Sequence, residues 1–244
     1  MMLKETSRAS KVTLWLSFGV LGAAVIAALI IFFLPTEKST DAPDAAATAS
    51  PAPASSTPTA DAGGIGCKAP ARDNRKVPTD LRWAASQGVT WPVSDSTGPT
   101  TTTAGFPACF EHSPTGAALA AVSSLYAQID HSPRDVGEFY LAESPGRDAA
   151  LADIGSSPST LKNQLESNGL ALVGFQVEQY DGDRAAIRII IRVPNSSTGF
   201  RGLPYPMVWA DGDWKIQPLD NGSTGEASDV TSSEFIGWTA VGNG

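Results

Sequence analysis

The residues that could do chemistry are few, and none stands in a recognised catalytic pattern. The chain has two histidines, His112 and His131, and neither lies in a pattern that supplies a nucleophile together with an oriented base. The GxSxG, HExxH and Walker phosphate-loop motifs are all missing. A Ser-His-Asp triad assembled from scattered residues stays an alternative, but the sequence predicts a protein that is not an enzyme.

Two pairs of aspartates could suggest a calcium site. Asp181 and Asp183 flank one glycine, and Asp211 and Asp213 flank another. Asp-Gly is an ordinary residue choice for a hairpin turn, and the further ligands of an EF-hand loop are missing. The pattern therefore favours turns over an ion site, and we expect neither a metal nor a cofactor.

The two cysteines, Cys67 and Cys109, could form a disulfide or remain as two free thiols. Cys109 also makes a CxxH pair with His112, but a metal set would need Cys67 and His131 as well, and this spacing matches no usual zinc pattern. A disulfide here would stabilise the fold by about 4 kcal/mol, because it restricts the unfolded chain. We expect the disulfide if the domain is exported to an oxidising compartment.

Two sets of residues are candidates for binding a partner protein. Arg184, Arg188 and Arg192 share one face of a predicted strand and could dock an acidic partner, although the solvated face of a strand explains them as well. Tyr205 and Trp209 could belong to an exposed aromatic patch, which would mark an interface, or they could lie in the core.

The element that decides the compartment is an uncharged apolar run at residues 12–34. Its 23 residues would rise about 34 Å as a helix, enough to cross a hydrocarbon core of about 30 Å. Lys4, Arg8 and Lys11 precede the run, so the positive-inside rule keeps residues 1–11 in the cytoplasm. A cleaved signal peptide is the alternative, but its apolar region is usually only about 7–15 residues long.

The rest of the chain is then outside the cell membrane. Residues 35–66 are rich in Ala, Pro, Ser and Thr and predict a disordered linker, because they hold too little apolar area to offset the entropy of ordering. Residues 67–244 have the size of one domain and carry 13 basic and 20 acidic side chains, a net charge of −7. That charge argues against nucleic acid as a partner.

Three helices are predicted in the exported domain. Ser113 is a good N-cap and Pro114 suits the first position of a helix. A second helix is predicted over 133–143, and a third begins at 157–158 and ends at Gly169. The first helix has one apolar stripe, formed by Leu119, Val122, Tyr126 and Ile129. Before it, residues 83–110 are broken by Pro and Gly and predict an extended segment that wraps the domain, with packing anchors at Trp83, Trp91 and Phe106.

Strands are predicted in the second half. Residues 173–177 and 184–193 alternate between apolar and polar side chains, which indicates an antiparallel hairpin with one buried face. A three-residue loop at 181–183 would place Gln176 beside Arg188. A further hairpin turns at 211–213 and is expected to point Val208, Ala210, Trp214 and Ile216 into the core, and a last strand or packed tail contains Phe235, Ile236 and Trp238.

Two stretches resemble an uncharacterised family of actinobacterial membrane-anchored proteins. In that family a Pro-x-Ser…Gly-Pro segment precedes a helix start of the form Ser/Thr-Pro-x-Gly-Ala-Ala, and residues 207–218 resemble the final hairpin. The likeness covers about residues 81–240. The matching residues of the first stretch are Pro92, Ser94, Gly98, Pro99, Ser113, Pro114, Gly116, Ala117 and Ala118.

This resemblance carries expectations about fold and role. The family is similar in layout to the bitopic assembly subunits of conjugative type IV secretion machines, whose exported domain has the cystatin-like (nuclear-transport-factor-two-like) fold. That implies an α+β domain with helices packed on a curved antiparallel sheet, which suits the predicted order of helices followed by strands. It also implies a non-enzymatic scaffold, so no catalytic residues carry over.

We therefore expect a single-pass membrane protein whose exported domain assembles with other envelope proteins or with itself, in a conjugation or type IV secretion apparatus. The alternative is an exported domain that binds a small ligand or an envelope polymer in the pocket of a cone-shaped fold. In either case the bilayer is contacted through residues 12–34.

Overall fold

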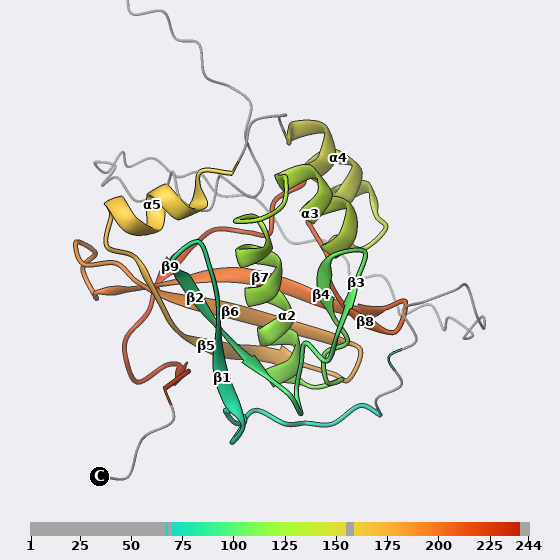
Figure 1. Ribbon diagram of the computed structural model, residues 1–244, viewed down its shortest axis with the longest axis horizontal. Coiled ribbons are helices and arrows are strands. Elements are labelled where there is room, and N and C mark those ends of the chain that lie inside the picture. The colour runs from blue at the N-terminus through green and yellow to red at the C-terminus, as the bar shows by residue number, and fades with distance from the viewer. Residues whose placement is uncertain (1–66, 68–69, 155–158, 240–244) are drawn as a thin grey trace, which may run out of the picture.

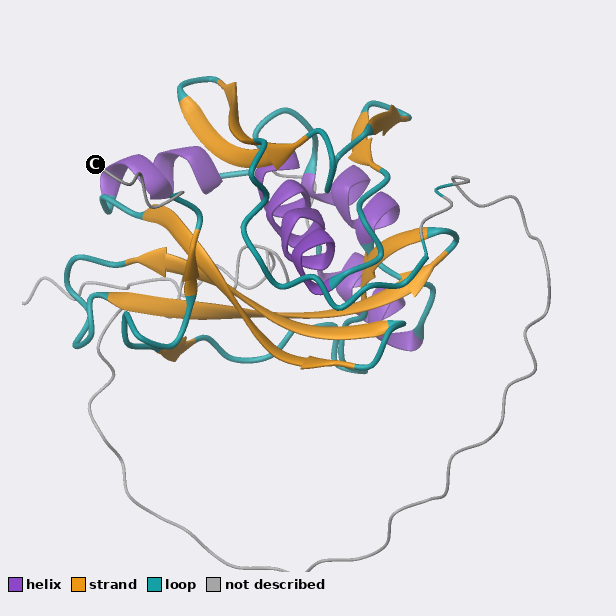
Figure 2. Cartoon of the chain, turned by 90° about the horizontal axis from the view of Figure 1, so that it is seen from below, coloured by secondary structure: helices purple, strands orange, loops and turns teal. Residues whose placement is uncertain are grey.

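The computed structural model describes residues 67, 70–154 and 159–239, and these residues form an α+β fold (Figure 1). A curved antiparallel sheet carries helix α2 on one face, and two short hairpins lie on the other side of α2 (Figure 2). The elements are β1 Leu81–Ser86, β2 Val89–Ser94, β3 Thr101–Thr103, β4 Phe106–Ala108, α2 Pro114–Ala127, α3 Pro133–Tyr140, α4 Pro145–Asp153, α5 Leu161–Ser167, β5 Ala171–Tyr180, β6 Arg184–Arg192, β7 Phe200–Ala210, β8 Asp213–Ile216, β9 Ser228–Asp229 and β10 Ile236–Gly237.

The predicted membrane span at 12–34 and linker at 35–66 lie outside the described residues. None of the helices in the described ranges combines the length and apolar character needed to cross a bilayer.

The main sheet has the strand order β10-β5-β6-β7-β8, with β9 beside β7, and its pairs are antiparallel. Residues 181–183 join β5 to β6, and Gln176 faces Arg188 as predicted. The carboxylate of Asp181 accepts the backbone N–H of Arg184 at 2.8 Å, which closes this loop. The buried face of β6 is confirmed at Ile187, Ile189 and Ile191.

Helix α2 is buried on every side. The predicted apolar stripe is confirmed at Leu119, Val122 and Tyr126, which are buried, whereas Ile129 lies beyond the end of the helix. Its start is as predicted, because the Ser113 hydroxyl accepts the backbone N–H of Gly116 at 3.1 Å. The alanines of α2 allow the sheet to approach one side. The β1–β2 hairpin covers the other side, where the Trp91 and Tyr126 rings stack with their centroids 5.5 Å apart.

A Ser-Pro pair also begins the next two helices. Ser132 caps α3, which is shorter than predicted because Leu141 already bridges to Ile216 of β8. Ser144 caps α4, a helix that was not predicted although it has the same start signal. Helix α5 begins at Leu161, and the predicted start at 157–158 lies outside the described residues. The chain leaves this helix at Gly169 with a φ of +61° as predicted.

The segment before α2 forms two hairpins, which corrects the prediction of an extended wrapping segment. Gln87–Gly88 joins β1 to β2, and Ala104–Gly105 joins β3 to β4. All four turn residues have positive φ, as two-residue type I′ turns require, but Gln and Ala are unusual at the first position. Trp83 is 45% exposed and anchors nothing, whereas Phe106 is buried and Trp91 is half-buried.

The β7–β8 hairpin differs from prediction by one residue of register. Only Asp211 and Gly212 form the turn, so Ala210 pairs with Asp213 and Trp209 pairs with Trp214. A one-residue shift moves the side chains of one strand to the opposite face. Trp214 and Ile216 face the core as predicted, but β7 contributes Leu203, Tyr205 and Met207 in place of Val208 and Ala210.

The closing segment packs as predicted. β10 pairs with β5, and the fully buried Trp238 stacks on Phe175 with ring centroids 4.5 Å apart. On the opposite face of the sheet, Ile190 and Val230 are both buried, so this face is not uniformly exposed to solvent.

Candidate functional site

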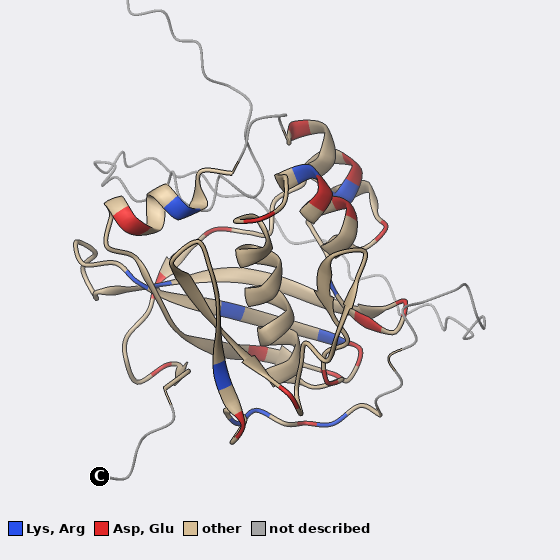
Figure 3. Cartoon of the chain, in the orientation of Figure 1, with Lys and Arg blue, Asp and Glu red and all other residues tan. Residues whose placement is uncertain are grey.

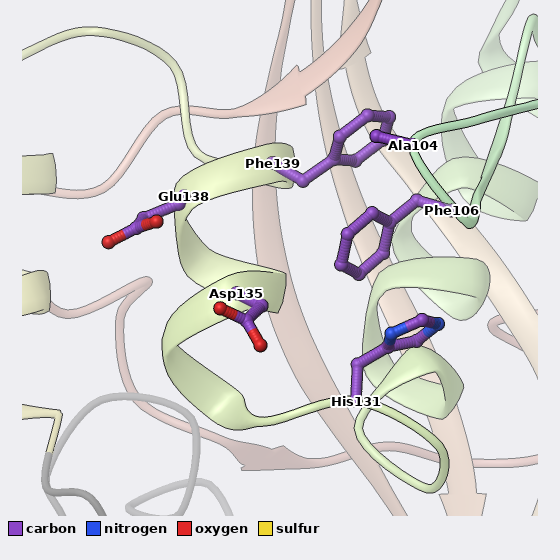
Figure 4. Close-up of a pocket in the computed structure, with 6 residues that line it drawn as sticks. All are labelled: Ala104, Phe106, His131, Asp135, Glu138 and Phe139. Atoms are coloured by element: carbon purple, nitrogen blue, oxygen red, sulfur yellow. The ribbon is translucent and has the colours of Figure 1, made fainter.

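An open hollow of about 460 Å³ lies between α3 and the β3–β4 hairpin (Figure 4). The side chains come from three places: the β3–β4 hairpin, the loop that leads into α3, and α3 itself. The lining residues are Ala104, Phe106, His131, Asp135, Glu138 and Phe139.

Local sequence explains why three of these residues share one side of α3. Ser132 accepts the backbone N–H of Asp135 at 3.1 Å and fixes where the helix begins. Asp135, Glu138 and Phe139 then follow at i, i+3 and i+4, which places them on one helical face. The Tyr140 hydroxyl donates to the backbone oxygen of Pro107 at 2.8 Å and holds α3 against the hairpin.

The apolar wall of the hollow is a column of stacked groups. His131 packs on Phe106 at 4.3 Å between centroids, and Phe106 stacks on Phe139 at 4.6 Å. The Lys215 ammonium lies 4.3 Å from the centroid of the Phe139 ring, an arrangement typical of a cation–π contact. The column therefore runs from a buried cation on β8 to an imidazole at the surface.

Lys215 also fixes the end of α3. Its Nζ donates to the backbone oxygen of Phe139 at 2.7 Å. Burial lowers the pKa of Lys215, and the nearby Asp213 and Asp211 oppose that effect. The side chain is only 7% exposed, so it supports the wall from behind and does not enter the hollow from solvent.

The two carboxylates of the hollow differ in their partners. Glu138 forms an ion pair with Arg134 at 3.0 Å. The carboxylate of Asp135 has no ion pair or hydrogen bond within the described ranges, and Figure 4 shows Asp135 on α3, across the hollow from the Phe106 and His131 rings. The hollow therefore presents one uncompensated negative charge.

The surrounding surface is also acidic. Residues 130–153 contain six acidic and two basic side chains, and both arginines are paired with glutamates of the same segment. Figure 3 shows the resulting concentration of acidic residues along α3 and α4. This face favours a positively charged ligand.

The arginines predicted as a docking stripe do not form one continuous surface. Arg184 and Arg192 are exposed. Arg188 lies between them and is tied down, because it forms an ion pair with Glu178 at 2.6 Å and a hydrogen bond with Ser228. The stripe is therefore interrupted at its centre.

The predicted aromatic patch is corrected in part. Tyr205 is 3% exposed and belongs to the core, where burial raises the pKa of its hydroxyl, so it offers no surface. Trp209 is half-buried and lies flat on His112, with ring centroids 3.8 Å apart. The register shift of β7 explains both positions.

His112 serves as packing in this structure. It is buried, and its Nε2 lies 2.9 Å from the backbone oxygen of Gly182 and 3.3 Å from Oδ1 of Asp183. A ring nitrogen that faces a carbonyl is the donor of that bond. His112 thus links the start of α2 to the β5–β6 loop.

The predicted disulfide is confirmed. Cys67 and Cys109 are bonded, with their Cα atoms 5.2 Å apart. Asp213 supports this connection, because its carboxylate accepts the backbone N–H groups of Cys109, Phe110 and Trp214 at 2.7, 3.0 and 2.9 Å. Burial raises the pKa of Asp213, and the three hydrogen bonds oppose that rise. The sequence indicated only a turn residue here.

Sequence reasoning missed the hollow. Of its lining residues, His131 was considered for chemistry, Phe106 for packing, and Phe139 for the buried side of the helix predicted over 133–143, whereas Asp135 and Glu138 were not singled out. The i, i+3, i+4 spacing of Asp135, Glu138 and Phe139 was a usable signal for a shared face. The opposing wall was not predictable without the β3–β4 hairpin.

Comparison with known proteins places this α+β chain in a family. It belongs to DUF8175, described as a domain of unknown function, whose family model matches residues 40–240. The match begins inside the stretch predicted as linker and includes the hollow and both cysteines. No curated protein and no solved structure matches the chain.

Proposed function

We propose that this chain is a single-pass cell-membrane protein whose exported domain binds another envelope protein through the hollow and its acidic surroundings. Residues 12–34 are the anchor, residues 1–11 stay in the cytoplasm, and residues 35–66 are the linker. The apolar run and the basic residues before it support this topology.

Two further features support export and the finer fold assignment. The Cys67–Cys109 disulfide is typical of proteins that fold in oxidising compartments. The curved sheet with α2 across one face is the arrangement expected of a cystatin-like domain. The resemblance to bitopic subunits favours a conjugation or type IV secretion apparatus as the assembly.

The observation that carries a docking role is the hollow itself. It is open at the surface, has an aromatic wall, and contains the uncompensated Asp135 carboxylate. Among the described residues, its lining has one histidine and two carboxylates but no serine, threonine, cysteine or lysine that could act as the nucleophile of a hydrolase. Such a surface suits binding of a partner group.

An interior ligand pocket is the alternative role. Ile187, Ile189 and Trp214 are at most 1% exposed and belong to the core cluster that includes α2. These side chains occupy the space that a pocket between α2 and the sheet would need. The exterior hollow is therefore the site that we propose.

Site-specific photo-crosslinking in intact cells tests the proposal. A benzoylphenylalanine placed at Glu138 should yield a larger adduct that contains an envelope protein. The matched control is Glu166 on α5, which is also exposed but lies far from the hollow (Figure 1). A chain that stays monomeric from both positions would contradict the proposed role.

A further inference from the structure

We propose that the group bound in the hollow is the positively charged end of a basic side chain, arginine above all, presented by the partner protein. This inference rests on the proposed docking function and names the chemistry of its ligand. The shape of the hollow, its charges and its aromatic wall each favour such a side chain.

The shape suits part of a larger ligand. The hollow is open to solvent and holds about 460 Å³, so its occupant is not enclosed by protein. A small molecule usually needs most of its surface buried to bind well. A side chain needs less, because the chain that carries it makes further contacts around the rim.

The charges select a cation. On α3, Arg134 compensates Glu138, whereas Asp135 lines the hollow and its carboxylate has no protein partner among the described residues. Both of its oxygens can accept, which matches the two parallel N–H groups of a guanidinium. An anionic group would meet this carboxylate and the acidic surface of residues 130–153.

The wall suits the carbon stem of a long basic side chain. The stacking column occupies the faces of Phe106 and Phe139, since Lys215, Phe139, Phe106 and His131 follow one another at 4.3 to 4.6 Å. His131 and Phe139 are half-buried, so part of each side chain remains accessible along the hollow. The methylene groups of arginine or lysine can pack there while the charged end reaches Asp135.

The occupant comes from another protein, for reasons of charge. The exported domain carries a net charge of −7, so a basic segment of a partner would be attracted to it over several ångströms. The nearest basic residues of the chain are already engaged: Arg134 with Glu138, Arg147 with Glu143, and Lys215 with Phe139. A second copy carries the same net charge of −7 and would be repelled overall on approach.

The two histidines make a direct test possible. His131 lines the hollow and His112 is buried beneath Trp209, so histidine-selective isotope labelling of the full chain gives one reporter and one internal control. The probe is the peptide acetyl-Arg-Arg-Arg-amide, with a citrulline peptide of the same shape but no charge as the comparison. The chain is kept in detergent with a tag that contains no histidine.

We expect the arginine peptide to shift the His131 signals saturably and to leave His112 unchanged. Asp135→Asn should weaken the affinity by about five-fold, as for other solvent-exposed charge pairs. Asp153→Asn, on α4 and outside the hollow, is the matched control and should retain the affinity. The citrulline peptide should give no shift.

Three results would overturn the inference: an unmoved His131, an equal shift with the citrulline peptide, or full affinity in the Asp135→Asn chain. Tighter binding of free spermidine than of the peptide would also overturn it, because the ligand would then be a small polyamine. The proposed function fails separately. If the yield of the crosslink from Glu138 is undiminished in the Asp135→Asn chain, the docking role is supported, but a basic side chain is not the group that is bound.

Discussion

The carboxylate of Asp213 accepts the backbone N–H of Cys109 at 2.7 Å, across 104 positions of sequence. This bond joins the disulfide, through Cys109, to the last hairpin of the main sheet. Cys109 has a φ of +63°, an uncommon conformation for a residue other than glycine. Asp213 accepts hydrogen bonds from the backbone N–H groups of both Cys109 and the next residue, Phe110. The segment before α2 is thereby fastened to the sheet.

Replacing Asp213 should destabilise the domain substantially. Asp213→Asn puts an amide N–H₂ where an acceptor is needed, which leaves at least one of three buried backbone donors unpaired. We expect a loss of about 2 kcal/mol in the free energy of unfolding, measured by urea titration with tryptophan fluorescence. Asp211→Asn is the control, because Asp211 is exposed and asparagine tolerates its φ of +55°. Equal stability of the two variants would contradict this role for Asp213.

The disulfide should stabilise the folded domain by restricting the unfolded chain. Changing both Cys67 and Cys109 to serine is expected to lower the free energy of unfolding by about 2–4 kcal/mol. Adding reductant to the wild-type chain should bring its urea midpoint to that of the double variant, and should not change the variant. If reductant leaves the wild-type midpoint in place, the bond makes no such contribution.

Asp80 gives the stability a defined dependence on pH. The Ser94 hydroxyl donates to Asp80 at 2.6 Å and lowers the pKa of this carboxyl below its ordinary value of 3.8, with help from Ser96. A lowered pKa in the folded state means that the stabilisation is present above pH 3.8 and is lost as the pH falls through the folded value. Asp80 is partly exposed, and solvent screens its charge, so Asp80→Asn should cost only about 0.5 kcal/mol at neutral pH.

The Asp80→Asn variant also tests the direction of this pH dependence. Urea titrations of the wild-type and Asp80→Asn chains at several pH values should show the difference shrinking as the solution is acidified below pH 3.8. A difference that grows on acidification would show that the charged carboxylate is not the stabilising form.

Lys215 should keep the C-terminal end of α3 ordered, and with it the Phe139 side of the hollow. Lys215→Met keeps the length and the apolar stem but cannot donate to the Phe139 oxygen. We expect faster amide hydrogen exchange at residues 139–142, where Leu141 and Ala142 pair with β8. Lys162→Met on α5, whose charge only pairs with Glu166 at the surface, should leave that exchange unchanged. Equal exchange in both variants would remove Lys215 from this role.

Local signals in the sequence were sufficient for much of the fold. Ser113-Pro114 marked the start of α2, and the Gln176–Arg188 pair was predicted correctly. A three-residue loop would place Tyr180 opposite Arg184, but Tyr180 pairs with Ala185, and an irregularity between Val177 and Gln179 restores the predicted pairing. The same reasoning missed the face of β7. Whether Asp213 belongs to the turn or to the strand changes the register by one, and only its tertiary bonds to Cys109 and Phe110 decide the matter.

The hollow was beyond local reasoning for a related cause. Its walls come from α3 and from the β3–β4 turn, which lie about thirty residues apart in the chain. The turn has Ala104 at positive φ, a position that ordinary turn preferences assign to Asn, Asp or Gly. The disulfide, by contrast, needed only two cysteines and a predicted compartment.

Thiol labelling of intact cells tests the central claim most directly. The chain has two cysteines and they are bonded to each other, so a cysteine introduced at Ser167 on α5 would be its only free thiol. We predict that a membrane-impermeant maleimide labels Ser167→Cys in whole cells once any wall barrier is removed, and labels Ser7→Cys only after lysis. Labelling of Ser7→Cys in whole cells, with Ser167→Cys protected, would contradict the topology and the docking role that depends on it.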